Sequence, residues 1–231
     1  MSPIAANLQA IRRRISSALQ GDSRAVRLVA VSKSQPPEAI RAAFDAGVRD
    51  FGENYVRDAV PKIEALGDLG ATWHFIGHLQ SNKAREVAER FDWVHGVDRT
   101  RIAEALSGAR PEGKPPLDVC IQVNISGEDT KGGVAPEDAL ALARSVAPLP
   151  RLQLRGLMGM ASFTGDVAVQ RAQFARLART RDGIVAAGIA LDTLSMGMSQ
   201  DFEAALAEGS TLVRIGTAIF GERSKPGPAP G

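Results

Sequence analysis

The sequence predicts an α/β fold, a single (β/α)8 barrel of the TIM type with an extra helix at its N-terminus. Short apolar runs alternate along the chain with turns and Ala-rich amphipathic patterns, and strict alternation of strands and helices is typical of a parallel sheet. The length of 231 residues fits such a barrel in one domain. Eight strand–helix units favour closure into a barrel, and a doubly wound open sheet is the alternative.

The first helix is predicted over residues 4–19, where apolar residues recur at helical spacing. The predicted strands cover residues 26–31, 49–51, 72–76, 93–97, 117–124, 152–158, 193–196 and 212–215. The helices predicted after the first seven strands cover about 36–47, 55–66, 82–91, 100–107, 136–147, 167–187 and 201–208. Pro36 and Pro37 favour the start of the first of these helices, and Gly47 favours its end.

The body of the chain contains no Pro/Gly-rich linker, so residues 1–223 are expected to form one domain. Residues 224–231 read SKPGPAPG, a composition that predicts a disordered tail. The net charge of +2 comes from 28 basic and 26 acidic residues, without a long basic run of the kind that binds nucleic acid. The consecutive arginines Arg12 to Arg14 are expected on a solvated helix face, with a polyanion site as the alternative.

The single cysteine, Cys120, lies inside an apolar run and is expected to be a small buried side chain. One cysteine excludes an intrachain disulfide, which fits a reducing compartment. The N-terminus has no apolar signal region, and no apolar stretch approaches membrane-spanning length. We therefore expect a cytoplasmic protein that binds neither nucleic acid nor a membrane.

Polar, glycine and methionine residues gather where the predicted strands end. In barrels of this type the chemistry lies at that end. The segments that follow the strands are Ser32-Lys33, Gly52 to Tyr55, Gly77 to Lys83, Asp98, Asn124, Met158 to Met160, Ser195 to Ser199 and Gly216-Thr217. Their common location predicts a site at this rim.

Lys33 is the sharpest candidate, because it follows an apolar run that should be buried on both faces. Desolvation lowers the pKa of a lysine and raises its neutral, nucleophilic fraction, and a neutral amine is what a Schiff base requires. The alternative is a lysine that extends from the strand end to solvent.

The segments after the seventh and eighth predicted strands, Ser195 to Ser199 and Gly216-Thr217, are rich in glycine and hydroxyl groups. Barrels often bind a phosphate there through backbone N–H groups. Tight turns alone are the alternative explanation of these glycines. Arg214 lies inside the eighth strand and needs a partner because its charge cannot be removed. Either a rim carboxylate, Asp98 or Glu53, or the aromatic nitrogen of a ligand meets that need.

Other motifs are absent from the sequence. The three histidines, His74, His78 and His95, have spacings that match no metal site, and no Cys/His cluster accompanies them. The sequence lacks a P-loop, a nucleophile elbow and a G-x-G-x-x-G after the first strand.

The rim motifs resemble those of the YggS/PROSC family of pyridoxal 5'-phosphate (PLP)-binding proteins, also called PLP homeostasis proteins. The matching segments are AVSKSQP (30–36), FGENYV (51–56), WHFIGHLQSNK (73–83), QLRGLM (153–158), LSMGMSQDFEAAL (194–206) and GSTLVRIGTAIFGER (209–223). They follow the order of the family over nearly the whole chain. The resemblance implies a one-domain barrel similar to the N-terminal domain of alanine racemase.

The resemblance also implies a set of PLP-binding residues: Lys33, Asn54, His74, Ser195, Ser199, Arg214, Gly216 and Thr217. By this match, Lys33 forms the internal aldimine and Arg214 faces the pyridine nitrogen. The serines, glycine and threonine hold the phosphate, and Asn54 and His74 lie at the rim near the cofactor. An arginine at the ring nitrogen disfavours its protonation, so the cofactor is a weaker electron sink than one paired with a carboxylate.

The resemblance is to carriers and to racemases, and the sequence favours a carrier. Alanine racemases use a second domain and a tyrosine base, whereas the only tyrosine here is Tyr55 and only Lys33 is an obvious base. The expected role is therefore non-enzymatic: a monomer that holds PLP, buffers its concentration and delivers it to apo-enzymes. A racemase-like enzyme acting on small amino acids is the alternative. An aldolase that uses Lys33 without a cofactor is a more distant one.

Overall fold

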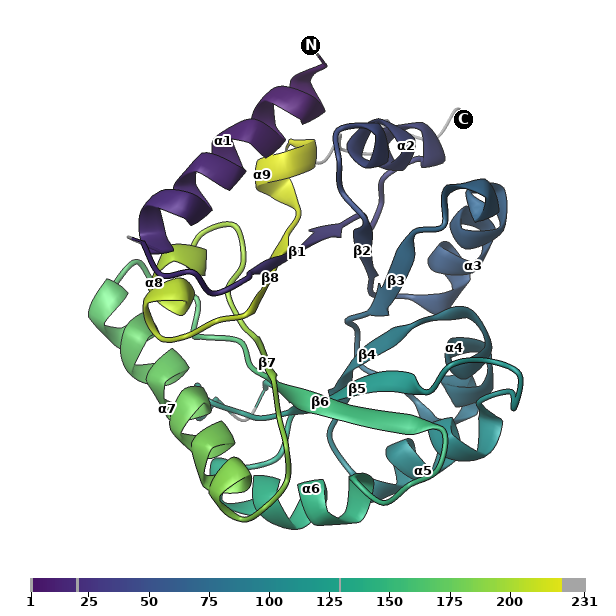
Figure 1. Cartoon of the computed structure of the whole chain (residues 1–231), viewed down its shortest axis with the longest axis vertical. Coiled ribbons are helices and arrows are strands. Elements are labelled where there is room, and N and C mark those ends of the chain that lie inside the picture. The colour runs from purple at the N-terminus through teal and green to yellow at the C-terminus, as the bar shows by residue number, and fades with distance from the viewer. Residues whose placement is uncertain (1, 20, 129, 222–231) are drawn as a thin grey trace, which may run out of the picture.

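Eight parallel strands close into a barrel, in the order of the chain (Figure 1). The computed structural model describes residues 2–19, 21–128 and 130–221. The strands are β1 (Arg27–Val31), β2 (Asp50–Glu53), β3 (Thr72–Phe75), β4 (Trp93–Val97), β5 (Leu117–Gln122), β6 (Leu152–Met158), β7 (Thr193–Ser195) and β8 (Leu212–Ile215). Closure is made by β8, which pairs with β1 in parallel so that Arg214 lies opposite Val29. The predicted barrel is confirmed, and the open-sheet alternative is wrong.

A ring of helices surrounds the strands, as Figure 1 shows. These helices are α1 (Pro3–Leu19), α2 (Pro37–Asp45), α3 (Val56–Ala65), α4 (Ala84–Arg90), α5 (Thr100–Ala109), α6 (Ala139–Val146), α7 (Val167–Ala186), α8 (Phe202–Ala207) and α9 (Thr217–Phe220). The predicted helices 82–91 and 136–147 each begin as a short 3-10 turn, at Ser81–Lys83 and Pro136–Asp138. The single-turn helix α9 was not predicted, since four residues are too few to show a periodic pattern.

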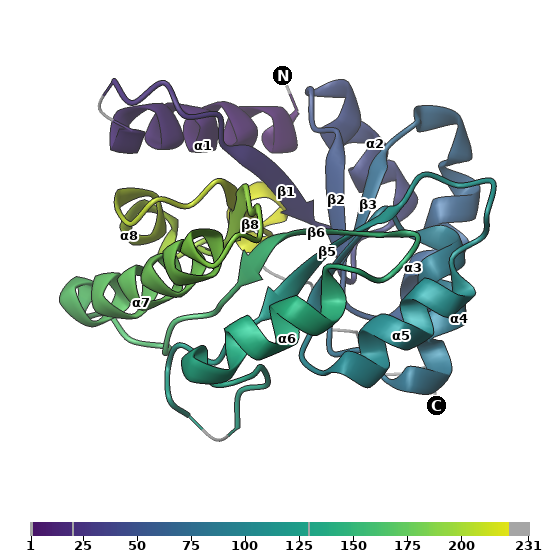
Figure 2. The ribbon, with the colours of Figure 1, turned by 60° about the horizontal axis from the view of Figure 1, so that its bottom comes forward.

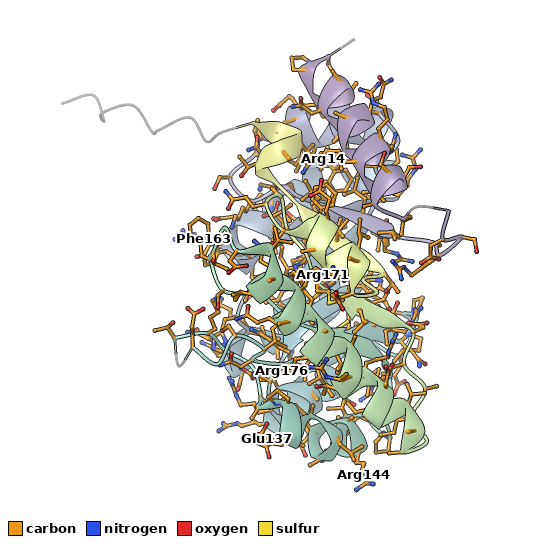
Figure 3. The ribbon with its side chains drawn as sticks, turned by 90° about the vertical axis from the view of Figure 1, so that its left-hand side faces the viewer. Arg14, Glu137, Arg144, Phe163, Arg171 and Arg176 are labelled. Carbon is orange, nitrogen blue, oxygen red and sulfur yellow. The ribbon has the colours of Figure 1, made fainter. Side chains whose placement is uncertain are left out.

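Helix α1 packs outside the barrel against α8 and α9 through its buried residues Leu8 and Ile11. Two ion pairs join α8 to its neighbours. Arg14 of α1 lies 2.7 Å from Glu203, and Arg171 of α7 lies 2.7 Å from Glu208 at the end of α8. Figure 3 shows both arginines on this side of the molecule. The extra N-terminal helix is therefore part of the helical ring.

The strands have two different faces. Residues Val94, Val119 and Leu157 belong to the main apolar core beneath the helices. The residues next to these on the same strands form a second, small cluster of Trp93, Cys120 and Met158. Because successive side chains of a strand point to opposite faces, this second cluster lies inside the barrel. Cys120 is fully buried there, as predicted.

Strands β6 and β7 approach closely at a glycine. A Cβ atom on Gly156 would lie only 1.8 Å from the carbonyl oxygen of Thr193, so no larger residue fits without moving the strands. The connection from β5 to α6 extends beyond one end of the barrel, as Figure 2 shows. Within the described ranges, the structure contains no helix with the length and apolarity needed to cross a bilayer. The predicted tail, residues 224–231, lies outside the described residues.

Candidate functional site

A pocket of about 540 Å³ opens among the carboxyl ends of the strands. Its lining includes five of the residues predicted from the sequence: Lys33, Ser199, Arg214, Gly216 and Thr217. These residues come from the two ends of the chain. They meet because β8 closes the barrel against β1. The pocket has the size of a small-molecule site, and it combines three basic groups, Lys33, Lys131 and Arg214, with hydroxyl groups.

The backbone around Lys33 is held on both sides. Ser32, fully buried, donates its N–H to the carbonyl of Gly52 at 3.0 Å and its hydroxyl to Glu53 Oε1 at 2.6 Å. Lys62 Nζ donates to the Ser32 carbonyl at 2.9 Å. Ser34 has a positive φ of 63°, which is uncommon for a residue with a side chain. The loop that carries Lys33 is thus fixed by buried polar contacts.

Arg214 lies at the inner wall of the pocket and is only 4% exposed. Its Nη1 donates to the carbonyl oxygen of Ser195 at 2.7 Å and also to the Ser195 hydroxyl, and its Nη2 donates to the Gly159 carbonyl at 3.2 Å. Burial lowers the pKa of Arg214 to about 10, with Asp201 opposing that shift. The guanidinium therefore remains a cation at neutral pH, and it is held by neutral oxygen atoms.

The segment from Ser195 to Ser199 turns sharply at Gly197. This residue has a φ of 94°, and a Cβ there would lie 2.7 Å from that of Ala205. Asp201 stabilises the turn by accepting the Met198 N–H at 2.6 Å, and burial raises the pKa of this carboxyl. Ser199 is presented beside α9, where the Ala218 N–H donates to its hydroxyl at 3.4 Å. Hydroxyl and N–H groups are donors suited to a phosphate.

Three predicted residues do not line this pocket. Ser195 is fully buried beneath it, in contact with Arg214. Asn54 lines a separate pocket with His78, and its Oδ1 is buried without a partner in the described structure. His74 was expected at the rim, but it lies inside the barrel, where it contacts Asp50 and His95 and is fully buried. His74 lies within β3 rather than after its end, so the expectation that it lies at the rim is wrong.

Lys131 and Phe163 are among the pocket residues that sequence reasoning missed. Lys131 lines the pocket from the loop after β5, and its Nζ donates to the Ala161 carbonyl at 2.7 Å. Phe163 lines the mouth from the loop between β6 and α7; it is 91% exposed, and Figure 3 shows it projecting from the molecule. Both belong to irregular loops, where neither periodicity nor a motif marked them.

The chain matches the family described as alanine racemase, N-terminal domain, over residues 2–224. It belongs to this family. A pyridoxal phosphate homeostasis protein of Pseudomonas aeruginosa is 54% identical over 99% of this chain and 100% of its own length. A protein of the same name from Escherichia coli is 50% identical over 96% of this chain and 98% of its own. These similarities confirm the resemblance to the YggS/PROSC family.

Solved structures agree with this family membership. The structure of PipY from Synechococcus elongatus with PLP bound has a TM-score of 0.83 and 38% identity, and covers 94% of this chain and 100% of that one. The structure of PipY without PLP has a TM-score of 0.85 and 40% identity, with the same coverage.

Proposed function

We propose that this protein binds PLP in the pocket at the strand ends and holds it as a Schiff base on Lys33. The observation that carries the proposal is that Lys33 and Arg214 line the same pocket together with Ser199, Gly216 and Thr217. The PLP-bound structure of PipY, a relative at 38% identity, supports it. PLP itself supplies an aldehyde, an aromatic nitrogen and a phosphate, and the pocket offers a separate group for each.

Lys33 would hold PLP through its primary amine, and the cofactor would supply the aldehyde for a Schiff base with it. Arg214 meets the pyridine nitrogen. Because it stays charged at neutral pH, it keeps that nitrogen unprotonated and limits the cofactor as an electron sink. Ser199, Gly216 and Thr217 hold the phosphate. Gly216 suits this role because it packs tightly on the strand that leads to Lys33, where its Cβ would lie 3.3 Å from Val31.

The remaining predicted residues act around this core of contacts. Asn54 lines a separate pocket, and its proposed place near the cofactor is supported by the family resemblance alone. Ser195 acts by holding Arg214. His74 acts at a distance, since it lies inside the barrel.

We assign the protein a carrier role rather than a catalytic one. In the described part of the chain, the ionisable side chains that line the pocket are Lys33, Lys131, Asp201 and Arg214. Tyr55, the only tyrosine, is 65% exposed and lines a different pocket. Racemisation needs a base on each face of the substrate, and this set of lining residues includes neither a tyrosine nor a histidine to act with Lys33. The protein would hold PLP, buffer its concentration in the cytoplasm and release it to apo-enzymes, acting as a monomer.

The test is an absorption spectrum of the purified protein with PLP, beside Lys33→Ala and the matched control Lys83→Ala. The wild type and the control should absorb near 420 nm, as Schiff bases of this cofactor do, and Lys33→Ala should lack this band. A band that survives in Lys33→Ala overturns the anchor, and a wild type that takes up no PLP overturns the binding. The carrier role is tested by PLP transfer to an apo-enzyme and by incubation with single enantiomers of amino acids. Enantiomer exchange at about 1 per second or faster would indicate a racemase instead.

A further inference from the structure

A line of hydrogen-bonded side chains crosses the barrel interior from Asp50 to Arg214. Asp50 Oδ1 lies 2.9 Å from His74 Nε2, and His74 Nδ1 lies 3.0 Å from His95 Nε2. His95 Nδ1 lies 2.8 Å from Ser195 Oγ, which accepts from Arg214 Nη1. Asp50 opens β2 and Ser195 ends β7. The line therefore runs from the amino end of the barrel to the pocket.

The two ends determine where each proton in this line resides. A carboxylate only accepts hydrogen bonds, so the atom of His74 that faces Asp50, Nε2, carries a proton. In a neutral imidazole the other nitrogen is then an acceptor. Its neighbour, His95 Nε2, must therefore be the donor, which leaves His95 Nδ1 as an acceptor for the Ser195 hydroxyl.

The opposite direction does not satisfy the same contacts. If the Ser195 hydroxyl accepted from His95 Nδ1, the neutral His95 would accept at Nε2 from His74 Nδ1. His74 Nε2 would then be an acceptor that faces an acceptor oxygen of Asp50. Each hydrogen bond has one donor and one acceptor only if donation runs from Arg214 to Ser195, then to His95, His74 and Asp50.

The surroundings keep both imidazoles neutral. His74 and His95 are fully buried, and burial lowers the pKa of each. Asp50 and Asp92 oppose the shift at His74, whereas Arg27 reinforces it at both histidines and Arg214 reinforces it at His95. The ring of Trp93 stacks on His74 with centroids 5.4 Å apart, which covers its face with apolar surface.

We propose that His74 and His95 are positioning residues for the cofactor. Asp50 fixes the tautomer of His74 and, through it, that of His95, so that the Ser195 hydroxyl donates to His95 and its oxygen accepts from Arg214. The cofactor part of this inference rests on the proposed function. Arg214 Nη1 donates hydrogen bonds to both the carbonyl oxygen and the hydroxyl of Ser195. The orientation of the Ser195 hydroxyl therefore determines how the guanidinium is held at the wall of the pocket. A carboxylate at the far end of the barrel thus contributes to PLP binding without contacting PLP.

The first test needs no cofactor. Nitrogen-15 NMR of the imidazole rings distinguishes the Nδ1–H from the Nε2–H tautomer, and the chain has only three histidines. His78 is exposed, and a His78→Asn variant assigns its signal. We expect His74 and His95 of the apo-protein to be neutral and protonated at Nε2 at pH 7. A proton on Nδ1 of either residue overturns the directed line.

The second test compares two carboxylates at the amino end of the barrel. Asp50→Asn lets the amide present either an oxygen or an N–H to His74, so the direction of the line is no longer fixed. Asp118 is a matched control: its side chain is 23% exposed against 17% for Asp50, and it pairs with Arg155 rather than with the histidines. Asp118→Asn removes the same charge but leaves the line intact.

We expect Asp50→Asn to raise the dissociation constant for PLP about fivefold, which is the effect of losing one hydrogen bond. It should also introduce a mixture of histidine tautomers. Asp118→Asn should leave both unchanged. Equal PLP binding by Asp50→Asn and the wild type, or an equal loss in Asp118→Asn, overturns the positioning role. A wild type that binds no PLP contradicts the proposed function instead, whereas the tautomers of the apo-protein test the line by themselves.

Discussion

The hydroxyl of Ser32 donates to Glu53 Oε1 across 2.6 Å, immediately before Lys33 in the chain. Lys62 Nζ lies 2.8 Å from the same oxygen, and the Glu53 side chain is only 1% exposed. The loop that carries Lys33 is therefore anchored on a buried ion pair. A buried pair adds little net stability, but the loss of one partner leaves the other charge uncompensated.

Glu53→Gln should lower the free energy of unfolding by about 3 kcal/mol, because Lys62 keeps its charge without a carboxylate. Urea unfolding measures the change. The double variant Glu53→Gln/Lys62→Met removes both charges and should recover most of the loss. A double variant as unstable as the single one would contradict this account.

Arg214→Gln should weaken PLP binding about tenfold or more, as expected for hydrogen bonds made by a charged group, while Lys33 still forms its Schiff base. Equilibrium titration followed at the Schiff-base band gives both quantities. Arg155→Gln, at the amino end of the barrel, is the control and should bind like the wild type. Unchanged affinity in Arg214→Gln would remove Arg214 from the site.

The stability of the protein should fall as the pH drops below 6.5. Burial lowers the pKa of His74 and His95 from that ordinary value, so the folded chain stays neutral where the unfolded chain takes up protons. Their contribution is fully present above pH 6.5 and is lost below it, by up to about 1.4 kcal/mol per histidine and pH unit. Urea unfolding at pH 7, 6 and 5 measures this slope.

His95→Gln should show a shallower slope than the wild type, because one of the two buried imidazoles is gone. His78→Asn should keep the slope of the wild type, since His78 is exposed. The same slope in all three proteins would mean that His95 does not contribute to the pH dependence.

Cys120 should not react with thiol reagents in the folded protein at pH 8. The thiol is fully buried, and burial raises its pKa to about 12. Since the chain has one cysteine, labelling followed by mass spectrometry has a single source. One label should appear in urea and none without it. Rapid labelling of the native protein would show that the barrel interior opens readily.

The barrel could be predicted because alternation of strands and helices is a local property of the sequence. The location of Lys33 and Arg214 at one rim followed from that topology, because Lys33 follows β1 and Arg214 lies near the end of the neighbouring strand β8. The hydrogen bond between His95 and His74 could not be predicted in this way. The two residues lie on different strands, and a contact between two strands leaves no trace in the spacing of residues. Lys131 was missed for a similar reason, because only the folded loop after β5 brings it to the pocket.

The pairing of β8 with β1 also bears on how the protein is made. Lys33 leaves the ribosome early, whereas Arg214, Gly216 and Thr217 belong to the last strand and helix of the described chain. A nascent polypeptide that has not yet released β8 has Lys33 but lacks Arg214, Gly216 and Thr217. Under the proposed function, only a chain that includes β8 carries all of these pocket residues, so a shortened translation product without β8 would leave the aldehyde in the cellular pool.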